Sequence, residues 1–401
     1  MRTYIFITLA LLAAALAACG GDGGASDAPT PAPEPQASAT IEVASEKPVV
    51  IGVSVALSGD QQNIGNDLAV AAQMAVDDYG SILGDHFITL SIRDDACTDP
   101  GSAVDVANLF SADPSLIGVV GPMCTVGAQA ANPLYEEAGV IHIAPVSTRD
   151  ELSQQGDEFF FRTAWHDSAQ AMLQARYLFE DLGGATAVVV DDSEPYGVGL
   201  ADAFEAAYTD AGGEVIERYR IERGDTDFSG LTRQVLAAAP AAVVFEGLNP
   251  EGALVVKALR EAGYAGTFMG PDGLLSVRDF IPTAGTAAEG AVLTGGPVAD
   301  AGFTARFEER TQRLPATPFV LQAYDAVTAL LRAAEATLVD GGDGTLTIDR
   351  AVLAEAMRNG RFAGLTGSIT FDDFGDRRGE TAPELGLRVY RIENAGLVLV
   401  E

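Results

Sequence analysis

Short apolar runs alternate with segments of helical periodicity along most of the chain. Residues 49–57 form a nearly continuous apolar run with many β-branched side chains, which is typical of a parallel strand buried on both faces. Residues 68–79 follow, with apolar positions at helical spacing. The same alternation predicts further strands at 87–92, 116–120 and 140–146 and further helices at 103–110 and 126–138.

A second series begins near residue 166. It predicts helices at 167–182, 199–211, 228–238 and 251–262, and strands at 187–190, 215–221, 242–245, 268–269 and 291–294. Long helices at 318–338 and 348–358 and short strands at 367–371, 385–392 and 397–400 close the chain. Two such series predict an α/β protein with two doubly wound, Rossmann-like lobes. Ligands of these sheets bind beyond the carboxyl ends of the strands, so we expect a ligand cleft between the lobes.

The N-terminal residues have the pattern of a secretion signal. Arg2 precedes an apolar run at 5–18 that is too short for a membrane span, and we interpret residues 1–18 as a signal peptide. The following Cys19 sits in a Leu-Ala-Ala-Cys sequence that resembles the bacterial lipobox, which implies lipidation. An ordinary secretory signal with a chance cysteine is the alternative. Residues 19–47 are rich in Gly, Ala, Ser, Pro and Asp, and we expect the lipidated cysteine and a flexible linker there.

Charge and cysteine usage narrow the function further. The formal net charge of −33 at pH 7 argues against nucleic acid as a partner, because a polyanion would be repelled. In an oxidising compartment, Cys97 and Cys124 are candidates for one disulfide, with two isolated buried thiols as the alternative.

Catalytic signatures are missing from the sequence. It contains no nucleophile elbow and no phosphate-binding loop, and we expect no enzyme activity, no cofactor and no metal. The histidines lie far apart, without metal-ligand spacing, and are expected to be structural. Three acidic residues follow the strand at 187–190, and we interpret them as a solvated acidic loop: Asp191, Asp192 and Glu194.

Several short motifs together resemble a known family. They occur, in order, at 51–65, 94–100, 119–125, 144–148, 161–163, 196–197, 227–229, 268–270 and 323–326. In this order they are similar to the branched-chain amino acid (Leu/Ile/Val) binding proteins of ABC importers, which have the type I periplasmic-binding fold. The resemblance extends over about residues 48–401 and implies that Cys97 pairs with Cys124.

The resemblance implies a clamp for the carboxylate of an amino acid. It assigns this clamp to Thr125 and Thr148, with backbone groups around Val146 and Ser147. Thr125 immediately precedes the helix predicted at 126–138, where free N–H groups and the helix dipole favour an anion. Ordinary helix capping and turn chemistry are the alternative for these residues.

The resemblance also implies a partner for the ammonium group. In the family, an acidic residue of the second lobe pairs with the ammonium group, and the matching position here is Asp272. Tyr196 matches a tyrosine that contributes a second-lobe contact. A carboxylate in an apolar cleft is costly unless a cation pairs with it, and an α-ammonium would supply that cation. A Pro-Asp-Gly turn on the surface is the alternative for Asp272.

Two positions depart from the family, and two others are candidates for the cleft. Well-studied members carry an aromatic residue near Ile64 and a tyrosine near Leu248, and both positions are aliphatic here. The general amino-acid clamp is therefore better supported than a specific side chain. Ser58 lies in the loop on the ligand side, and Trp165 falls at the predicted crossover between lobes.

These observations lead to one expected mechanism. Lobe 1 is expected at 48–165 and 297–366 and lobe 2 at 166–296 and 367–401, joined by a hinge that closes on a small amino-acid-like ligand. We expect a monomer, lipid-anchored outside the cytoplasm in the periplasm or on the cell surface, that hands its ligand to an ABC permease. The alternatives are a receptor of the same fold, or a binder of an amide, urea or small carboxylate.

Overall fold

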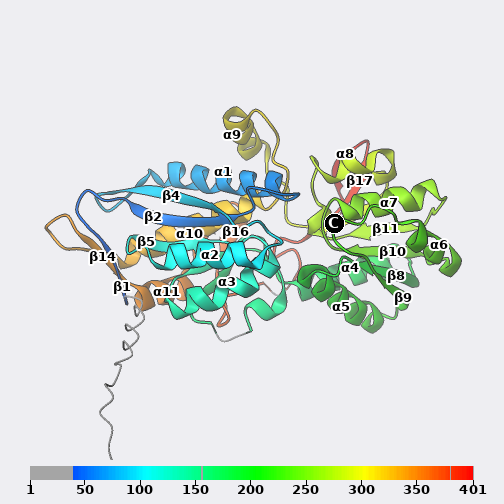
Figure 1. The fold of residues 1–401 in the computed structure, drawn as a ribbon, viewed down its shortest axis with the longest axis horizontal. Coiled ribbons are helices and arrows are strands. Elements are labelled where there is room, and N and C mark those ends of the chain that lie inside the picture. The colour runs from blue at the N-terminus through cyan, green and yellow to red at the C-terminus, as the bar shows by residue number, and fades with distance from the viewer. Residues whose placement is uncertain (1–38, 155–156, 380, 401) are drawn as a thin grey trace, which may run out of the picture. The chain divides into compact units, whose positions relative to one another are not determined.

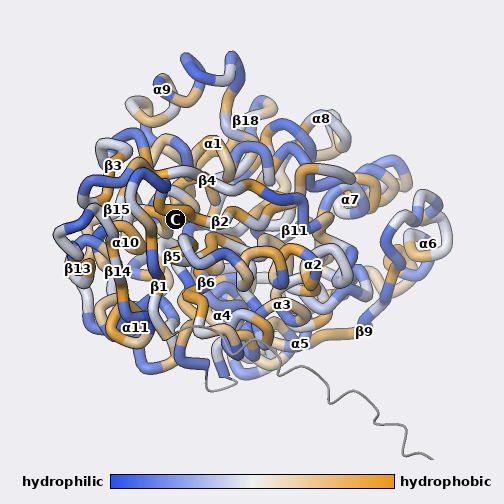
Figure 2. The backbone as a smooth tube through the Cα atoms, turned by 60° about the vertical axis from the view of Figure 1, so that its left-hand side comes forward, coloured by the Kyte–Doolittle hydropathy of each residue, from blue (hydrophilic) through white to orange (hydrophobic). Residues whose placement is uncertain are grey.

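The computed structural model describes residues 39–154, 157–379 and 381–400. The predicted signal peptide, Cys19 and residues 20–38 of the expected linker lie outside the described residues. Figure 1 shows the two α/β lobes that the alternating pattern predicts. In Figure 2, hydrophilic stretches are frequent in the outer loops, and hydrophobic stretches are frequent in the elements between them.

Lobe 1 is built on a six-stranded sheet. Its strand order is β3-β4-β2-β5-β6-β7, with β3 antiparallel and the others parallel. The strands are β2 (Val49–Val55), β3 (Ile82–Leu83), β4 (His86–Asp94), β5 (Leu116–Val120), β6 (His142–Ala144) and β7 (Phe160–Arg162). Every residue of β5 is buried, as expected of a central parallel strand.

Helices cover both faces of this sheet. On one face α1 packs against α10, and on the other α2 packs against α3 (Figure 1). Their bounds are α1 (Gln62–Tyr79), α2 (Pro100–Ser111), α3 (Thr125–Glu137) and α10 (Val320–Thr337). Lobe 1 also contains α9 (Ala301–Thr311), α11 (Arg350–Asn359) and a hairpin of β15 (Phe362–Gly364) and β16 (Gly367–Ile369).

Lobe 2 is built on a seven-stranded sheet. Its order is β18-β17-β12-β11-β10-β8-β9, and β17 alone runs opposite to the other strands of this sheet. The strands are β8 (Thr186–Asp191), β9 (Glu214–Arg220), β10 (Ala242–Glu246), β11 (Thr267–Gly270), β12 (Val292–Gly295), β17 (Arg388–Glu393) and β18 (Gly396–Leu399). The helices are α4 (Asp167–Arg176), α5 (Pro195–Asp210), α6 (Ser229–Ala238), α7 (Glu251–Glu261) and α8 (Phe280–Ala284).

Some predicted elements differ in detail. The helix predicted at 167–182 is α4 followed by a π-helical turn, Tyr177–Asp181. The strands β6 and β7 are three residues each, and β7 was not predicted. Short 3₁₀ turns occupy Asp150–Leu152, Asp272–Leu274 and Gly285–Ala288.

The expected linker ends earlier than residue 47. Residues Thr40–Val43 form β1, which pairs with β14 (Leu346–Asp349), and β14 also pairs with β13 (Val339–Asp340). Ile41 and Val43 are both 0% exposed. The assignment of this segment to a flexible linker was therefore wrong, because its two apolar side chains are buried against a strand about 300 residues away in the sequence.

The last crossing between lobes comes later than residue 367. The strand β16 pairs with β15, and the Phe371 ring lies 5.1 Å from the Phe161 ring of lobe 1. Arg162, at the end of β7, donates to Asp376 over 2.7 Å. Residues 367–376 thus contact lobe 1, although the pattern had placed them in lobe 2.

Candidate functional site

A pocket lies where the two lobes face each other. It has about 620 Å³ of empty space, part of it open to solvent. Its described lining residues are Gln61, Ile64, Cys97, Thr98, Met123, Cys124, Thr125, Val126, Val146, Ser147, Glu194, Pro195, Tyr196, Leu248, Asp272, Gly273 and Phe319. No Lys, Arg or His occurs among these described lining residues, so the only charged side chains are acidic.

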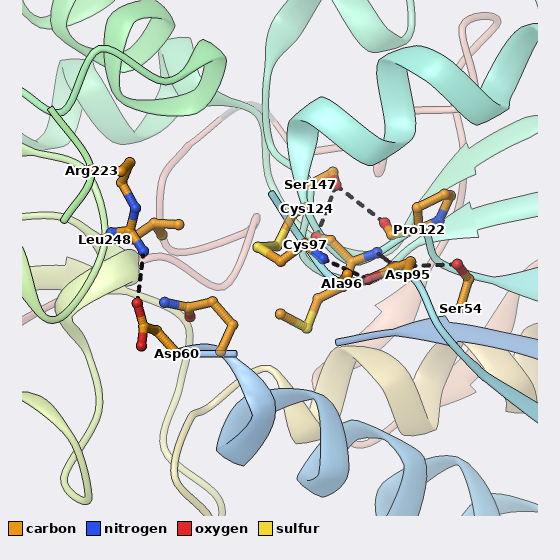
Figure 3. Close-up of a disulfide and its surroundings, with 12 residues drawn as sticks. Ser54, Asp60, Asp95, Ala96, Cys97, Pro122, Cys124, Ser147, Arg223 and Leu248 are labelled. Carbon is orange, nitrogen blue, oxygen red and sulfur yellow. Dashed lines mark hydrogen bonds and ion pairs between the residues drawn. A yellow bond between two sulfur atoms is a disulfide. The ribbon is translucent and has the colours of Figure 1, made fainter. Parts of the chain in front are cut away.

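The lobe 1 rim of the pocket is held by a disulfide and a buried carboxylate. Cys97 and Cys124 form the disulfide, and Cys124 occupies the N-cap position of α3 (Figure 3). Asp95, just before Cys97, accepts hydrogen bonds from the Cys97 N–H (3.2 Å), the Met123 N–H (3.0 Å) and the Ser54 hydroxyl (3.1 Å). These contacts fix the turn after β4 against the N-terminus of α3.

Thr125 is the first residue of α3, and it is 4% exposed. Cys124 caps the helix without a side-chain hydrogen bond, so Thr125 is not the helix cap that the alternative interpretation proposed. The first turn of α3 therefore presents backbone N–H groups and the positive end of the helix dipole at the pocket. An anionic group of a ligand would be stabilised there.

The other residues of the predicted carboxylate clamp divide into two groups. Val146 and Ser147 line the pocket, and the Ser147 hydroxyl donates to the carbonyl oxygens of Met123 (2.9 Å) and Pro122 (3.2 Å). Thr148 is not among the described lining residues, and its hydroxyl faces the Asp167 carboxyl instead. The structure brings Thr125, Val146 and Ser147 together, but not Thr148.

The lobe 2 wall carries a buried carboxylate opposite α3. Asp272 is 6% exposed, and the Tyr196 hydroxyl donates to its Oδ1 over 2.9 Å. Burial raises the pKa of Asp272 to about 6, and hydrogen bonds from Tyr196 and Gln170 limit that rise. A surface turn is excluded by this burial. The carboxylate is positioned to accept a cation from the pocket.

Two further carboxyl groups lie behind Asp272 and are fully buried. Burial, together with the smaller effects of the charges on Asp150 and Asp272, raises the pKa of Asp167 to about 8. Burial also raises the pKa of Glu246 well above its ordinary value. Asp272 is therefore the member of this buried group that ionises most readily.

The remaining walls are mostly apolar. Ile64 and Leu248, the two positions that depart from the family, both line the pocket together with Phe319. The Trp165 ring stacks on Phe319 at 5.1 Å and lies outside the described lining. Ser58 is also outside it, with its hydroxyl bonded to Asp94. Of the four candidate cleft residues, the structure thus places two at the pocket.

Several lining residues were missed in the sequence. Met123, Val126 and Phe319 belong to apolar stretches that look the same whether they face a core or a cleft. Gln61 and Pro195 lie beside helix starts without a motif of their own. A closer look at residues next to predicted strand ends could have found Gln61, Met123 and Pro195, since such positions line ligand clefts.

The prediction of a solvated acidic loop was wrong for two of its residues. Asp191 and Asp192 are each 0% exposed. Asp191 is paired with Arg218 at 2.7 Å, and Asp192 accepts backbone hydrogen bonds from Leu248 and Glu194. The sequence could not show this burial, because the partners Arg218 and Leu248 come from β9 and the β10–α7 loop, which are distant in the chain.

Direct contacts join the two lobes beside the pocket. Just before α1, the Gln61 side chain donates to the Asn249 carbonyl over 3.0 Å. Within α1, Asn63 donates to Asp279 over 2.8 Å. Further along the same helix, Asp67 pairs with Arg278 at 3.1 Å. In the structure the lobes therefore contact each other at the start of α1.

The fold and pocket are those of a type I, two-lobed binding protein, and comparison with known proteins gives the family. The sequence matches the periplasmic binding protein family over residues 48–396, and the chain belongs to that family. The predicted fold class is thereby confirmed.

The relatives and solved structures agree with this assignment. The chain is 33% identical over 343 residues to the leucine-, isoleucine-, valine-, threonine- and alanine-binding protein of Pseudomonas aeruginosa, covering 84% of this chain and 87% of that protein. It is 30% identical over 335 residues to a Leu/Ile/Val-binding protein of Rhizobium johnstonii, covering 82% and 88%. A leucine binding protein from Thermotoga maritima superposes with a TM-score of 0.77 at 26% identity, covering 88% and 98%.

The described residues contain no candidate for a membrane span. Across 39–154, 157–379 and 381–400, no helix is both long and apolar enough to cross a bilayer.

Proposed function

We propose that this protein is the extracytoplasmic solute-binding component of an ABC importer and that its ligand is an aliphatic α-amino acid or a close analogue. The observation that carries the proposal is that one wall of the pocket suits an anion and the opposite wall suits a cation. The N-terminus of α3 at Thr125 suits an anion, and the buried Asp272, hydrogen-bonded by Tyr196, suits a cation. An α-amino acid carries both groups on one carbon atom.

The apolar walls support the proposed side chain. Ile64, Leu248 and Phe319 surround the space between the two charged ends. Burying an aliphatic side chain against them is favourable by roughly 25 cal/mol per Å² of apolar surface removed from water. A ligand whose side chain carries a carboxylate would lose the hydration of that group in the pocket. No Lys, Arg or His among the described lining residues could pair with it.

The proposed mechanism is hinged closure without chemistry. The ligand carboxylate binds lobe 1 at Thr125, and lobe 2 then adds the contacts of Asp272 and Tyr196. A ligand that contacts both walls binds the closed state more tightly than the open one, and it shifts the population towards closure. The closed pair of lobes then presents the surface that an ABC permease would recognise.

The membrane anchor and the oligomeric state are parts of the same proposal. We place the protein outside the cytoplasm, on a membrane, through a lipid on Cys19, and as a monomer. Support comes from the lipobox-like Leu-Ala-Ala-Cys sequence at 16–19 and from the family, whose description is periplasmic. Metabolic labelling with a clickable fatty acid should label the wild type but not Cys19→Ser, and light scattering of the soluble form should give the mass of a single chain.

A thermal-shift screen tests the ligand class. The soluble form beginning at residue 39 is unfolded and refolded to remove retained ligand, then mixed with amino acids, amides, urea and small organic acids. A ligand at 100 times its dissociation constant adds about 2.7 kcal/mol of stability. We expect an aliphatic α-amino acid to raise the melting temperature, and the amine-free analogue of the same acid to leave it unchanged.

Variants locate the site in the same screen. Asp272→Asn should lose the response, because the amide cannot pair with an ammonium group. Asp349→Asn is the matched control, since Asp349 caps α11 outside the pocket and asparagine also caps helices well. A response only to compounds without an ammonium group, or an equal response in Asp272→Asn, would refute the proposed ligand class.

A further inference from the structure

One buried carboxylate connects the two loops that form the lobe 2 wall of the pocket. Asp192 follows the last residue of β8 and precedes α5, and it is 0% exposed. It is not among the described lining residues of the pocket. Its role must therefore be exerted through the residues that it contacts.

Each oxygen of Asp192 holds a different loop. Oδ1 accepts the N–H of Glu194 over 3.2 Å, in the loop that leads into α5. Oδ2 accepts the N–H of Leu248 over 3.0 Å, in the loop between β10 and α7. The backbone N–H of Asp192 also donates to the Glu246 carbonyl at 3.3 Å. A single side chain thus ties two loops that come from neighbouring strands.

Two glycines allow this close approach. A Cβ atom at Gly197 would lie 2.3 Å from Oδ1 of Asp192, and one at Gly247 would lie 2.6 Å from Oδ2. Any larger residue at either position would push the carboxylate out of its place. The two glycines therefore let both loops approach the carboxylate closely.

Both tied loops carry pocket residues. Glu194, Pro195 and Tyr196 line the pocket from the first loop, and Leu248 lines it from the second. We propose that Asp192 is a positioning residue that holds Tyr196 and Leu248 at the spacing a ligand requires, and that it thereby sets the affinity without touching the ligand. This inference rests on the proposed function for its affinity readout, whereas the loop geometry can be tested without any ligand.

The protonation state of Asp192 should matter to this clamp. Burial, with a smaller contribution from the charge of Glu194, raises the pKa of Asp192 to about 7, although Arg223 and the backbone hydrogen bonds lower it. The buried Glu246 also faces this group, from the end of β10. An ionised carboxylate accepts both N–H groups with full charge, and the protonated acid accepts them less strongly. The clamp therefore tightens as the pH rises through 7.

The neighbouring Asp191 provides a matched control. It is equally buried at 0% exposed, but it accepts from the Ser193 N–H (3.0 Å) and from Arg218 (2.7 Å) and Arg220 (3.4 Å). None of these partners is among the described lining residues of the pocket. Asp191→Asn thus removes the same charge one residue away without releasing the loop that carries Leu248.

Affinity and its pH dependence form the first test. The affinities for L-leucine, L-isoleucine, L-valine, L-threonine and L-alanine are measured by calorimetry from pH 6 to pH 8. The proteins compared are the wild type, Asp192→Asn and Asp191→Asn. At pH 8, Asp192→Asn should lower the affinity for the tightest-binding of these amino acids by about tenfold or more, which is the usual effect of losing a charged hydrogen bond. Between pH 7 and pH 8, where Asp272 with its pKa of about 6 is already ionised, it should also lose the rise in affinity. Asp191→Asn should stay within about threefold of the wild type and keep that rise.

Hydrogen exchange is the second test and needs no ligand. In Asp192→Asn, segments 193–199 and 247–252 should lose protection together, and in Asp191→Asn segment 247–252 should keep it. If Asp192→Asn does not fold, the wild type at pH 6 and pH 8, corrected for intrinsic exchange rates, gives the same comparison. An unchanged second segment, or equal effects of the two variants, overturns the inference. If no amino acid binds the wild type, the proposed function fails, and the exchange result still decides on the clamp.

Discussion

Asp167 should make the ligand-free protein less stable as the pH rises. This residue begins α4 and is 2% exposed. Burial is the main cause that raises its pKa from 3.8 to about 8; the charges of Asp150 and Asp272 also raise the pKa, and Thr148 and Arg162 lower it. In the folded protein Asp167 therefore keeps its proton at neutral pH, whereas in the unfolded chain it is ionised.

The size of the effect follows from proton linkage. Between about pH 4 and pH 8 the folded state binds one more proton at Asp167 than the unfolded state does. Each pH unit in this window lowers the free energy of unfolding by about 1.4 kcal/mol, or about 2.7 kcal/mol from pH 5 to pH 7. This slope is nearly constant from pH 5 to pH 7 because the folded pKa of about 8 lies above this range.

The substitution Asp167→Asn isolates this contribution. Asparagine has nearly the same shape and no proton to lose, so its contribution does not change with pH. We expect the stability of the variant relative to wild type to rise by about 2.7 kcal/mol between pH 5 and pH 7. The repulsion that comes from a net charge of −33 also changes with pH, but it is nearly equal in both proteins and cancels in the difference.

Urea unfolding of the ligand-free proteins at pH 5, 6 and 7 measures the difference. Asp349→Asn is the control, and its stability relative to wild type should be nearly constant, because Asp349 is exposed at the start of α11. If the difference for Asp167→Asn is also flat, the folded protein ionises Asp167. A cation such as that of Arg162 must then compensate the charge, and the reasoning about the buried acidic group is refuted.

Three other predictions concern different parts of the molecule. Ile41→Ala should lower the free energy of unfolding by about 2–5 kcal/mol in denaturant titrations, because the side chain is 0% exposed, whereas a residue in a flexible linker would have almost no effect. Arg278→Ala removes the 3.1 Å pair with Asp67 across the lobes and should raise the radius of gyration of the ligand-free protein in X-ray scattering; an unchanged radius would show that this pair does not hold the lobes together. Ligand affinity should fall about tenfold per pH unit below pH 6, because protonated Asp272, with a pKa of about 6, cannot pair with an ammonium group; calorimetry that finds constant affinity down to pH 4.5 would contradict this role.

Much of the fold could be predicted from the sequence because the strands are buried on both faces. Such strands read as continuous apolar runs, and β5 is an example in which every residue is buried. The strand β1 could not be predicted in this way because Thr40–Val43 carries only two apolar side chains. Its stability comes from pairing with β14, which no local pattern indicates.

The candidate site residues came from the resemblance to the family, and those that lie at the pocket also stand at local structural signals. Thr125 stands at a helix start, Tyr196 in the first turn of another, and Asp272 directly after a strand, and all three line one pocket. Thr148 was assigned to the clamp by the resemblance to the family, but its hydroxyl faces Asp167. Which way a side chain points at a strand end depends on the neighbours that pack around it.

The sequence by itself determined the alternation of strands and helices, the two lobes and the residues at the strand ends, because these depend on the local order of apolar and polar side chains. Only the tertiary structure decided which acidic residues are buried. Asp192 and Asp167 look like surface charges in the sequence, and both are enclosed by segments distant in the chain. The environment of a carboxylate is set by partners that meet only when the chain folds, and that environment determines its pKa and its role at the pocket.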